Sequence, residues 1–219
     1  MKSRESGNVL LYVLIAVVLF GLLSFAMTKQ NGDDSMAGSV AEGKARFRGE
    51  DLLNYATNIR TAIEQMVVMQ NVLPTEVNFI KPSDANYNTA PHTAKVFHPV
   101  GGGINVMNPA DEAYQSGSAK RGWVVQQGTN VVWTQTAASD IILTFLDIDS
   151  KACGEINRRL YKDATIPTTT VNTEAAFVNG GGNDADFLTA DCPSCNQRNS
   201  FCIKDSAGAY VFYNIVYAR

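Results

Sequence analysis

Four cysteines are the residues whose types and spacing most directly suggest chemistry in this 219-residue chain. Cys192 and Cys195 form a Cys-x-x-Cys motif, Cys202 follows it and Cys153 precedes it. A thioredoxin-like redox pair would need a βαβ unit around the motif, but the stretch before it is polar and rich in glycine. A zinc site of four thiolates has enough ligands, yet it lacks a second Cys-x-x-Cys. The pattern favours two disulfides over both alternatives, and three pairings remain open.

One short segment offers oxygen ligands to a calcium ion. Residues 180–186 read GGGNDAD, in which Asp184 and Asp186 supply two carboxylates. Calcium takes about six to eight oxygen ligands, so the segment falls short of a complete calcium loop. Asp184 and Asp186 are therefore weak calcium candidates, with a solvated turn as the alternative, and we expect no other cofactor.

The two histidines, His92 and His98, lie outside any metal-binding motif. The sequence has neither a nucleophile elbow nor a suggestive pair of acids beside them. Three glycines at 101–103 lack the following Lys-Ser/Thr of a phosphate-binding loop, and they predict a tight turn or close backbone packing. We therefore expect no catalytic residue and no small-molecule substrate, and we predict that the chain is not an enzyme.

Helices and strands that would position these residues can be read from the spacing of apolar side chains. A capping box at Ser39 and Glu42, followed by helical spacing of apolar residues, predicts an amphipathic helix to about Gln70. A second, shorter helix is predicted to begin at Asp149 or Ser150 and to end near Leu160. Residues 28–38 are polar, with two glycines, and predict a linker or a weakened stretch of helix.

The remainder of the chain is predicted to be strand-rich and mainly antiparallel. A hairpin is expected from 123–126 and 131–134, in which Trp123 and Trp133 are cross-strand or core aromatics rather than a ligand platform. Apolar and β-branched composition predicts two further strands at 141–146 and 210–217, and weaker candidates at 77–80 and 95–97. Helices followed by a meandering sheet indicate the α+β class.

Residues 9–27 form a run of nineteen positions without a charge. A helix of this length covers roughly 28 Å, which is close to the hydrocarbon thickness of a bilayer. Lys2 and Arg4 precede the run, whereas Lys29 is followed by two aspartates. The positive-inside rule therefore predicts a cytoplasmic N-terminus and a body on the other side of the membrane. A cleaved secretory signal would have a shorter apolar run followed by small residues.

Here the small residues Ser6 and Gly7 come directly before the apolar run and after a basic leader. This order resembles the class III leader of type IV prepilins and pseudopilins. The resemblance implies a leader at 1–7 that a prepilin peptidase cuts between Gly7 and Asn8, and a retained transmembrane helix at 8–27. Residues 97–103, 140–143 and 153–157 are also similar to a group of bacterial pilin-like proteins.

The resemblance carries two further expectations. Most pilins have a glutamate as the fifth residue after the cut, where it pairs with a neighbouring subunit, but the fifth residue here is Tyr12. Such a subunit resembles either the exceptional minor pseudopilins of a filament tip or a protein that never enters a filament. Pilin C-terminal regions are often stapled by disulfides, which implies that Cys153 ties its helix to the 192–202 loop.

Composition limits the function classes further. The chain has 18 basic and 21 acidic side chains and a formal charge of −3. It therefore lacks the basic excess that nucleic-acid binding requires. Residues 39–219 are expected to form one extracytoplasmic, pilin-like domain with disulfide-stapled C-terminal loops, because a body of this length can bury its own core.

Three functional hypotheses follow. In the first, the protein is a minor pilin- or pseudopilin-like subunit of a bacterial inner membrane, with prepilin peptidase and other pilin or pseudopilin subunits as partners. In the second, it is a membrane-tethered periplasmic binding module that forms no filament. The third, an anchored enzyme, depends only on the Cys-x-x-Cys motif and His98.

Overall fold

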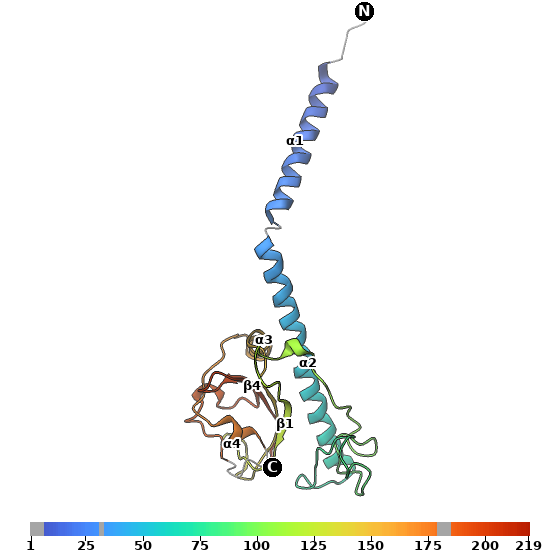
Figure 1. Cartoon of the computed structure of the whole chain (residues 1–219), viewed down its shortest axis with the longest axis vertical. Coiled ribbons are helices and arrows are strands. Elements are labelled where there is room, and N and C mark those ends of the chain that lie inside the picture. Colours follow the sequence, from blue (N-terminus) through green and yellow to red (C-terminus); the bar gives the residue numbers. More distant parts are fainter. Residues whose placement is uncertain (1–6, 31–32, 179–184) are drawn as a thin grey trace, which may run out of the picture. The chain divides into compact units, whose positions relative to one another are not determined.

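A computed structural model describes residues 7–30, 33–178 and 185–219 of the chain. Side chains of the two N-terminal helices are described at 11–22 and from residue 40 onward. The chain divides into two compact units, Met1–Lys44 and Ala45–Arg219. Its elements, drawn in Figure 1, are the helices α1 (Gly7–Gln30), α2 (Asp33–Met69), α3 (Ser150–Tyr161) and α4 (Thr173–Phe177), the 3-10 turns η1 (Asp111–Ala113) and η2 (Pro193–Cys195), and the strands β1 (Gly122–Gln126), β2 (Ile141–Leu146), β3 (Ser200–Lys204) and β4 (Tyr210–Tyr217).

Helix α1 carries apolar side chains on every side of its described part. All residues from 11 to 22 are exposed, including the large side chains of Leu14, Val18 and Phe20. Within the part of the chain that the structure describes, no helix meets the combined requirement of length and apolarity for a membrane span.

Helix α2 begins six residues before the predicted start at Ser39. The stretch expected to be a linker is helical at 28–30 and again from Asp33, while 31–32 lie outside the described residues. A single glycine such as Gly38 costs a helix only about 1 kcal/mol, so it does not have to end one. The C-terminal end agrees with the prediction, because Asn71 has a left-handed backbone and the Val72 N–H donates to Met66 C=O.

The four strands form one antiparallel sheet in the order β1-β2-β4-β3. Strands β2 and β4 are central and almost wholly buried, and they match the predicted ranges 141–146 and 210–217. Successive side chains of a strand point to opposite faces, so the sheet has two faces. The helix-covered face is defined by Ile141, Leu143, Phe145, Cys202, Phe212 and Val216. The loop-covered face is defined by Ile142, Leu146, Phe201, Ile203, Val211, Tyr213 and Ile215.

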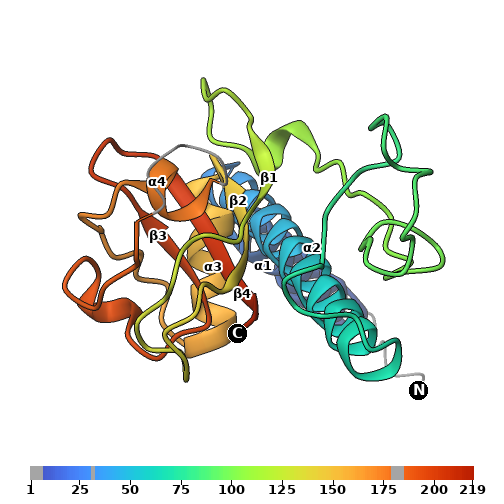
Figure 2. The ribbon, with the colours of Figure 1, turned by 90° about the horizontal axis from the view of Figure 1, so that it is seen from below.

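Helices α2 and α3 cover the helix-covered face (Figure 2). The buried stripe of α2 has the spacing predicted from the sequence: Leu52, Tyr55, Ala56, Ile59, Ile63 and Met66. Helix α3 is capped as predicted, because Asp149 accepts hydrogen bonds from the backbone N–H groups of Lys151 and Ala152. The two helices approach closely at Gly49, where an added Cβ would lie 3.1 Å from the carbonyl oxygen of Ala152.

The loop-covered face is closed by short elements and by aromatic side chains. Phe177 of α4 stacks on Tyr213 of β4, with ring centroids 5.6 Å apart, and Phe187 meets both rings edge-on. Phe177 and Phe187 lie ten positions apart, Tyr213 comes from the last strand, and each of the three rings is fully buried. Figure 2 shows α4 and the loops on the side of the sheet opposite α2.

The predicted hairpin of 123–126 with 131–134 is wrong. Strand β1 pairs instead with β2, with Trp123 opposite Phe145, and 131–134 form a turn that includes only an isolated bridge between Val131 and Phe187. The reason lies in Asp140, whose buried carboxylate accepts hydrogen bonds from Val131 N–H and the Thr134 hydroxyl. This side chain bends the segment into a loop. The weak strands at 77–80 and 95–97 are reduced to one parallel bridge between Asn78 and Lys95.

Candidate functional site: a hollow beside strand β1

All four cysteines are buried in disulfides, so the predicted pair of disulfides is confirmed. Cys153 of α3 pairs with Cys202 of β3, which ties the helix to the 192–202 region as expected, and Cys192 pairs with Cys195. Since every cysteine sulfur is in a disulfide and at most 1% of each residue is exposed, none is a thiolate available to zinc or to an incoming disulfide. In this state the zinc and redox interpretations do not hold.

The two histidines lie against each other rather than beside a catalytic partner. Their rings stack with centroids 4.3 Å apart and an interplanar angle of 12°. Val100 N–H donates to His98 Nδ1, and the Tyr87 ring lies 5.0 Å from the His98 ring. The pKa of His98 is lowered, first by desolvation and then by the nearby positive charges that His92 and Lys95 can carry. Protonation of His98 is therefore disfavoured in the folded chain.

The segment 86–98, which carries both histidines and is called the histidine loop below, is held together by the buried ammonium group of Lys95. Lys95 Nζ donates to the carbonyl oxygens of Asn86 and Tyr87, at 2.6 and 2.7 Å, and also to that of Thr89. The three glycines form the predicted tight turn in contact with this loop, because a Cβ on Gly101 would overlap the Lys95 carbonyl and one on Gly102 would lie 2.6 Å from the Val96 oxygen. The segment is thus a packed turn, not a phosphate-binding loop.

The calcium candidates are divided between described and undescribed residues. Asp184 lies outside the described residues, whereas Asp186 is exposed and accepts a hydrogen bond from Asn130 N–H at 3.3 Å. Among residues 7–30, 33–178 and 185–219, no three His, Cys, Asp or Glu side chains gather in a metal-binding arrangement. The processing candidates Gly7 and Asn8 belong to the first turn of α1, and residues 1–6 of the predicted leader lie outside the described part.

A hollow of about 510 Å³ lies beside β1 and is the clearest candidate binding site. One wall is the strand itself, residues 122–125, and another is the long segment between α2 and β1. Tyr55 of α2 contributes to the lining, and its Oη accepts a hydrogen bond from Met107 N–H. Burial raises the pKa of this phenol. The volume falls within the usual range of ligand pockets.

Aromatic rings and cations dominate the side chains around the hollow. Trp123 packs against Tyr55 and Phe145, with ring centroids 5.2 and 5.0 Å apart, as a core aromatic of the helix-covered face. The other tryptophan, Trp133, lies against Phe187 on the loop-covered face, so the two do not form a cross-strand pair. The charged residues of the lining are Lys81, Lys120 and Arg121, and the described lining contains no acid.

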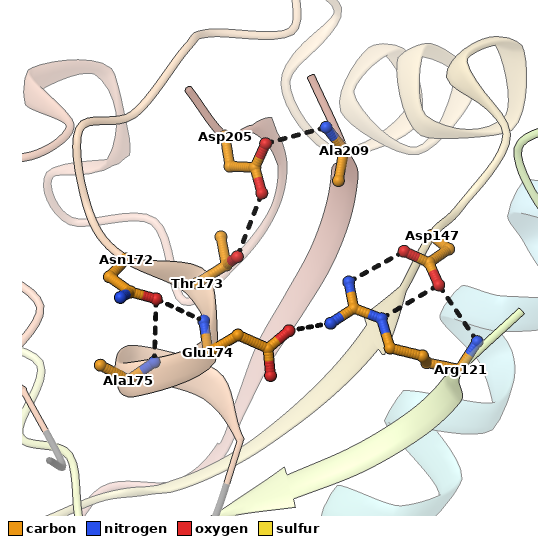
Figure 3. Close-up of polar contacts among 8 residues, drawn as sticks. All are labelled: Arg121, Asp147, Asn172, Thr173, Glu174, Ala175, Asp205 and Ala209. Atoms are coloured by element: carbon orange, nitrogen blue, oxygen red, sulfur yellow. Dashed lines mark hydrogen bonds and ion pairs between the residues drawn. The ribbon is translucent and has the colours of Figure 1, made fainter. Parts of the chain in front are cut away.

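Arg121 is held at the end of β1 by two acids from distant parts of the chain. Its guanidinium donates to both oxygens of Asp147, at 2.9 and 3.1 Å, and also to Glu174 of α4 (Figure 3). The hydrogen bonds from Arg121 lower the pKa of the Asp147 carboxyl. Nearby, Asp205 accepts hydrogen bonds from the Thr173 hydroxyl and from Ala209 N–H (Figure 3). This arrangement fixes α4 and the residue directly before β1 relative to each other.

None of these ion pairs was predicted from the sequence. Arg121 and Glu174 are 53 positions apart, and no local spacing connects them. The adjacent cations Lys120 and Arg121, directly before a predicted strand, were the one pattern that could have drawn attention to this end of β1.

The chain matches no protein-family model, no curated protein and no solved structure. The geometry alone therefore defines the class of the molecule: it is an α+β protein with a hollow at one edge of its sheet.

Proposed function

We propose that this protein is a single-pass, pilin-like subunit of a bacterial inner membrane, with its α+β body outside the cytoplasm. The observation that carries the proposal is the uncharged run at 9–27, which falls within α1. Every described side chain of this run, from residue 11 to residue 22, is exposed and apolar apart from the hydroxyl of Tyr12. A helix that is apolar all round is stable in lipid or among other apolar helices.

Two features of the body support this proposal, the first by its bearing on location and the second by its bearing on fold. Both pairs of cysteines are oxidised, and structural disulfides persist in oxidising compartments such as the periplasm. The order of elements also supports a pilin-like protein. The long helix α2 precedes the antiparallel sheet, and the C-terminal part of α2 packs on that sheet. In this proposal Lys2 and Arg4 remain in the cytoplasm until the leader is cut.

The proposal predicts a defined mature N-terminus. In cells that contain a prepilin peptidase, intact mass spectrometry should find a chain that begins at Asn8. A Gly7→Leu variant should keep residues 1–7, while the neighbouring substitution Ser3→Ala serves as a matched control and should be cut normally. A wild-type chain that still begins at Met1 in these cells would contradict the pilin-like assignment.

A second candidate function, a tethered binding module that does not assemble, is favoured by two observations. Tyr12 replaces the carboxylate that assembling pilins use, and the hollow beside β1 offers a site for a ligand. Cysteine crosslinking within 8–27 distinguishes the two functions. Ladders of crosslinked oligomers are expected for an assembling subunit, whereas a module that acts alone should give no species larger than a dimer.

A further inference from the structure

The two edges of the sheet differ in how their backbone groups are used. At the β3 edge, Thr169 N–H donates to Lys204 C=O at 2.8 Å and Lys204 N–H donates to Pro167 C=O at 2.9 Å, so the 167–169 segment covers part of this edge. At the β1 edge, no backbone hydrogen bond joins residues 122–125 to another described residue on the side that faces away from β2. The 167–169 segment therefore covers part of the β3 edge, whereas the backbone of residues 122–125 has no such cover among the described residues.

The sequence of strand β1 also lacks the charge, proline and bulge that usually protect an open edge. Its sequence, GWVVQ, contains neither a charged residue nor a proline, and its pairing with β2 is regular from Gly122 to Gln126. Natural proteins normally protect such an edge with lysine, proline, a bulge or a covering segment, because open edges pair with other strands. An edge without these features is suited to accept a strand from a partner.

The hollow lies along this same edge and is lined by Gly122, Trp123, Val124 and Val125. A strand added to β1 would therefore place every second side chain toward the hollow. The aromatic rings of Tyr55, Phe97 and Trp123 provide apolar surface for such side chains.

The charges around the hollow indicate the chemistry of the added strand. Lys81, Lys120 and Arg121 are the charged residues of its described lining. Arg121 is already paired with Asp147 and Glu174, and Lys120 contacts an Asp111 carboxylate that is 82% exposed. For Lys81, the described residues provide no ion pair. Acidic side chains of a partner would find Lys81 available and could compete for Lys120.

We propose that the β1 edge is a docking site for an extended acidic segment of a partner protein, which adds to the sheet as a fifth strand. Its backbone would pair with β1, its apolar side chains would enter the hollow, and its carboxylates would meet Lys81 and Lys120. Backbone pairing of this kind provides affinity, and the side-chain pockets provide specificity. The inference does not depend on cleavage at Gly7 or on filament assembly, and it holds for either function proposed above.

The test uses the full chain in detergent micelles and a fluorescein-labelled peptide of alternating valine and glutamate. We expect binding in the micromolar to millimolar range by fluorescence anisotropy, with chemical-shift changes at the amides of 122–125. Methylation of alternate peptide nitrogens should abolish binding, and a valine–lysine peptide should bind at least about tenfold more weakly. Absence of binding by the glutamate peptide at millimolar concentration, or equal binding of the N-methylated peptide, would overturn the proposal.

Charge variants locate the site. A Lys81→Glu/Lys120→Glu double variant should weaken binding by about tenfold or more, whereas Lys151→Glu, an exposed position on α3 outside the hollow, should leave it unchanged. Equal affinities of the double variant and the wild type would refute the role of these lysines. If the double variant fails to fold, the wild-type amide shifts decide alone, and changes confined to residues outside 122–125 would refute docking at this edge.

Discussion

The two faces of the sheet are built from the same four strands but closed in different ways. On the helix-covered face, α2 and α3 provide long apolar stripes, and a disulfide connects residues 49 positions apart. On the loop-covered face, a five-residue helix and several loops provide separate aromatic rings, and the disulfide spans only three positions. The helix-covered face therefore depends on regular helices and on a disulfide between distant residues, whereas the loop-covered face depends on the packing of individual side chains.

The largest loss of stability is expected when the long disulfide, Cys153–Cys202, is removed. Replacing both partners, as Cys153→Ala/Cys202→Ala, should lower the free energy of unfolding by about 4 kcal/mol, because a loop of 49 residues loses much entropy when it is closed. Urea unfolding of the detergent-solubilised full chain measures this change. A loss no greater than that of the short disulfide would break the comparison between the faces.

Asn157 should be the next most sensitive position on the helix-covered face. Its fully buried amide donates to the carbonyl oxygens of Thr165 and Cys202 and accepts from Cys202 N–H. Asn157→Ala would leave these backbone groups unpaired, and we expect a loss of about 3 kcal/mol in urea unfolding. The control Asn54→Ala, at an exposed position of α2, should change stability by less than about 0.5 kcal/mol. Similar values for the two variants would argue against the buried network.

The short disulfide of the loop-covered face should matter less. Cys192→Ala/Cys195→Ala is expected to cost about 2 kcal/mol or less, because closing a loop of three positions restricts the unfolded chain only slightly. The same urea experiment, with the long-disulfide variant alongside, provides the measurement. A loss equal to or larger than 4 kcal/mol, the figure expected for the long disulfide, would show that the aromatic cluster depends on this turn.

The smallest effect is expected from pH, at the histidine loop. Because the pKa of His98 in the folded chain lies below the ordinary value of 6.5, the unfolded chain binds the proton more tightly. The stabilising contribution of neutral His98 is therefore present above pH 6.5 and is lost as the pH falls below that value. Comparing urea midpoints at pH values on either side of 6.5 should show a larger drop for the wild type than for His98→Gln. An equal drop in the two proteins would exclude His98 as the cause of the loss of stability at low pH.

The contrast between the helix-covered face and the loop-covered face also explains which parts of the fold can be predicted from the sequence. The buried stripe of α2 follows from periodicity, the start of α3 from its cap, and β2 and β4 from their apolar and β-branched composition, because each signal lies within one element. The tie between Cys153 and the 192–202 region was also anticipated. These predictions concern mainly the helix-covered face and the two central strands.

The loop-covered face was predicted poorly, for physical reasons. Its conformation depends on contacts between distant residues, such as the hydrogen bonds from Val131 and Thr134 to Asp140 that replace a local hairpin. Strand β3 and helix α4 have five residues each, too few for a clear period. The hollow beside β1 was not predicted for the same reason, since it combines Tyr55 with residues from 79 to 178 that only the folded chain brings together.

The most direct test of the proposed membrane anchor is alkaline extraction of bacterial membranes that contain the full chain. We expect the wild type to remain in the membrane pellet and a Leu14→Asp/Val18→Asp variant to move to the soluble fraction, since each aspartate near the middle of a membrane helix costs about 3 kcal/mol. Leu14→Val/Val18→Leu, which keeps the run apolar, should stay in the pellet. Recovery of the wild-type chain, with residues 9–27 intact, in the soluble fraction would contradict the proposal.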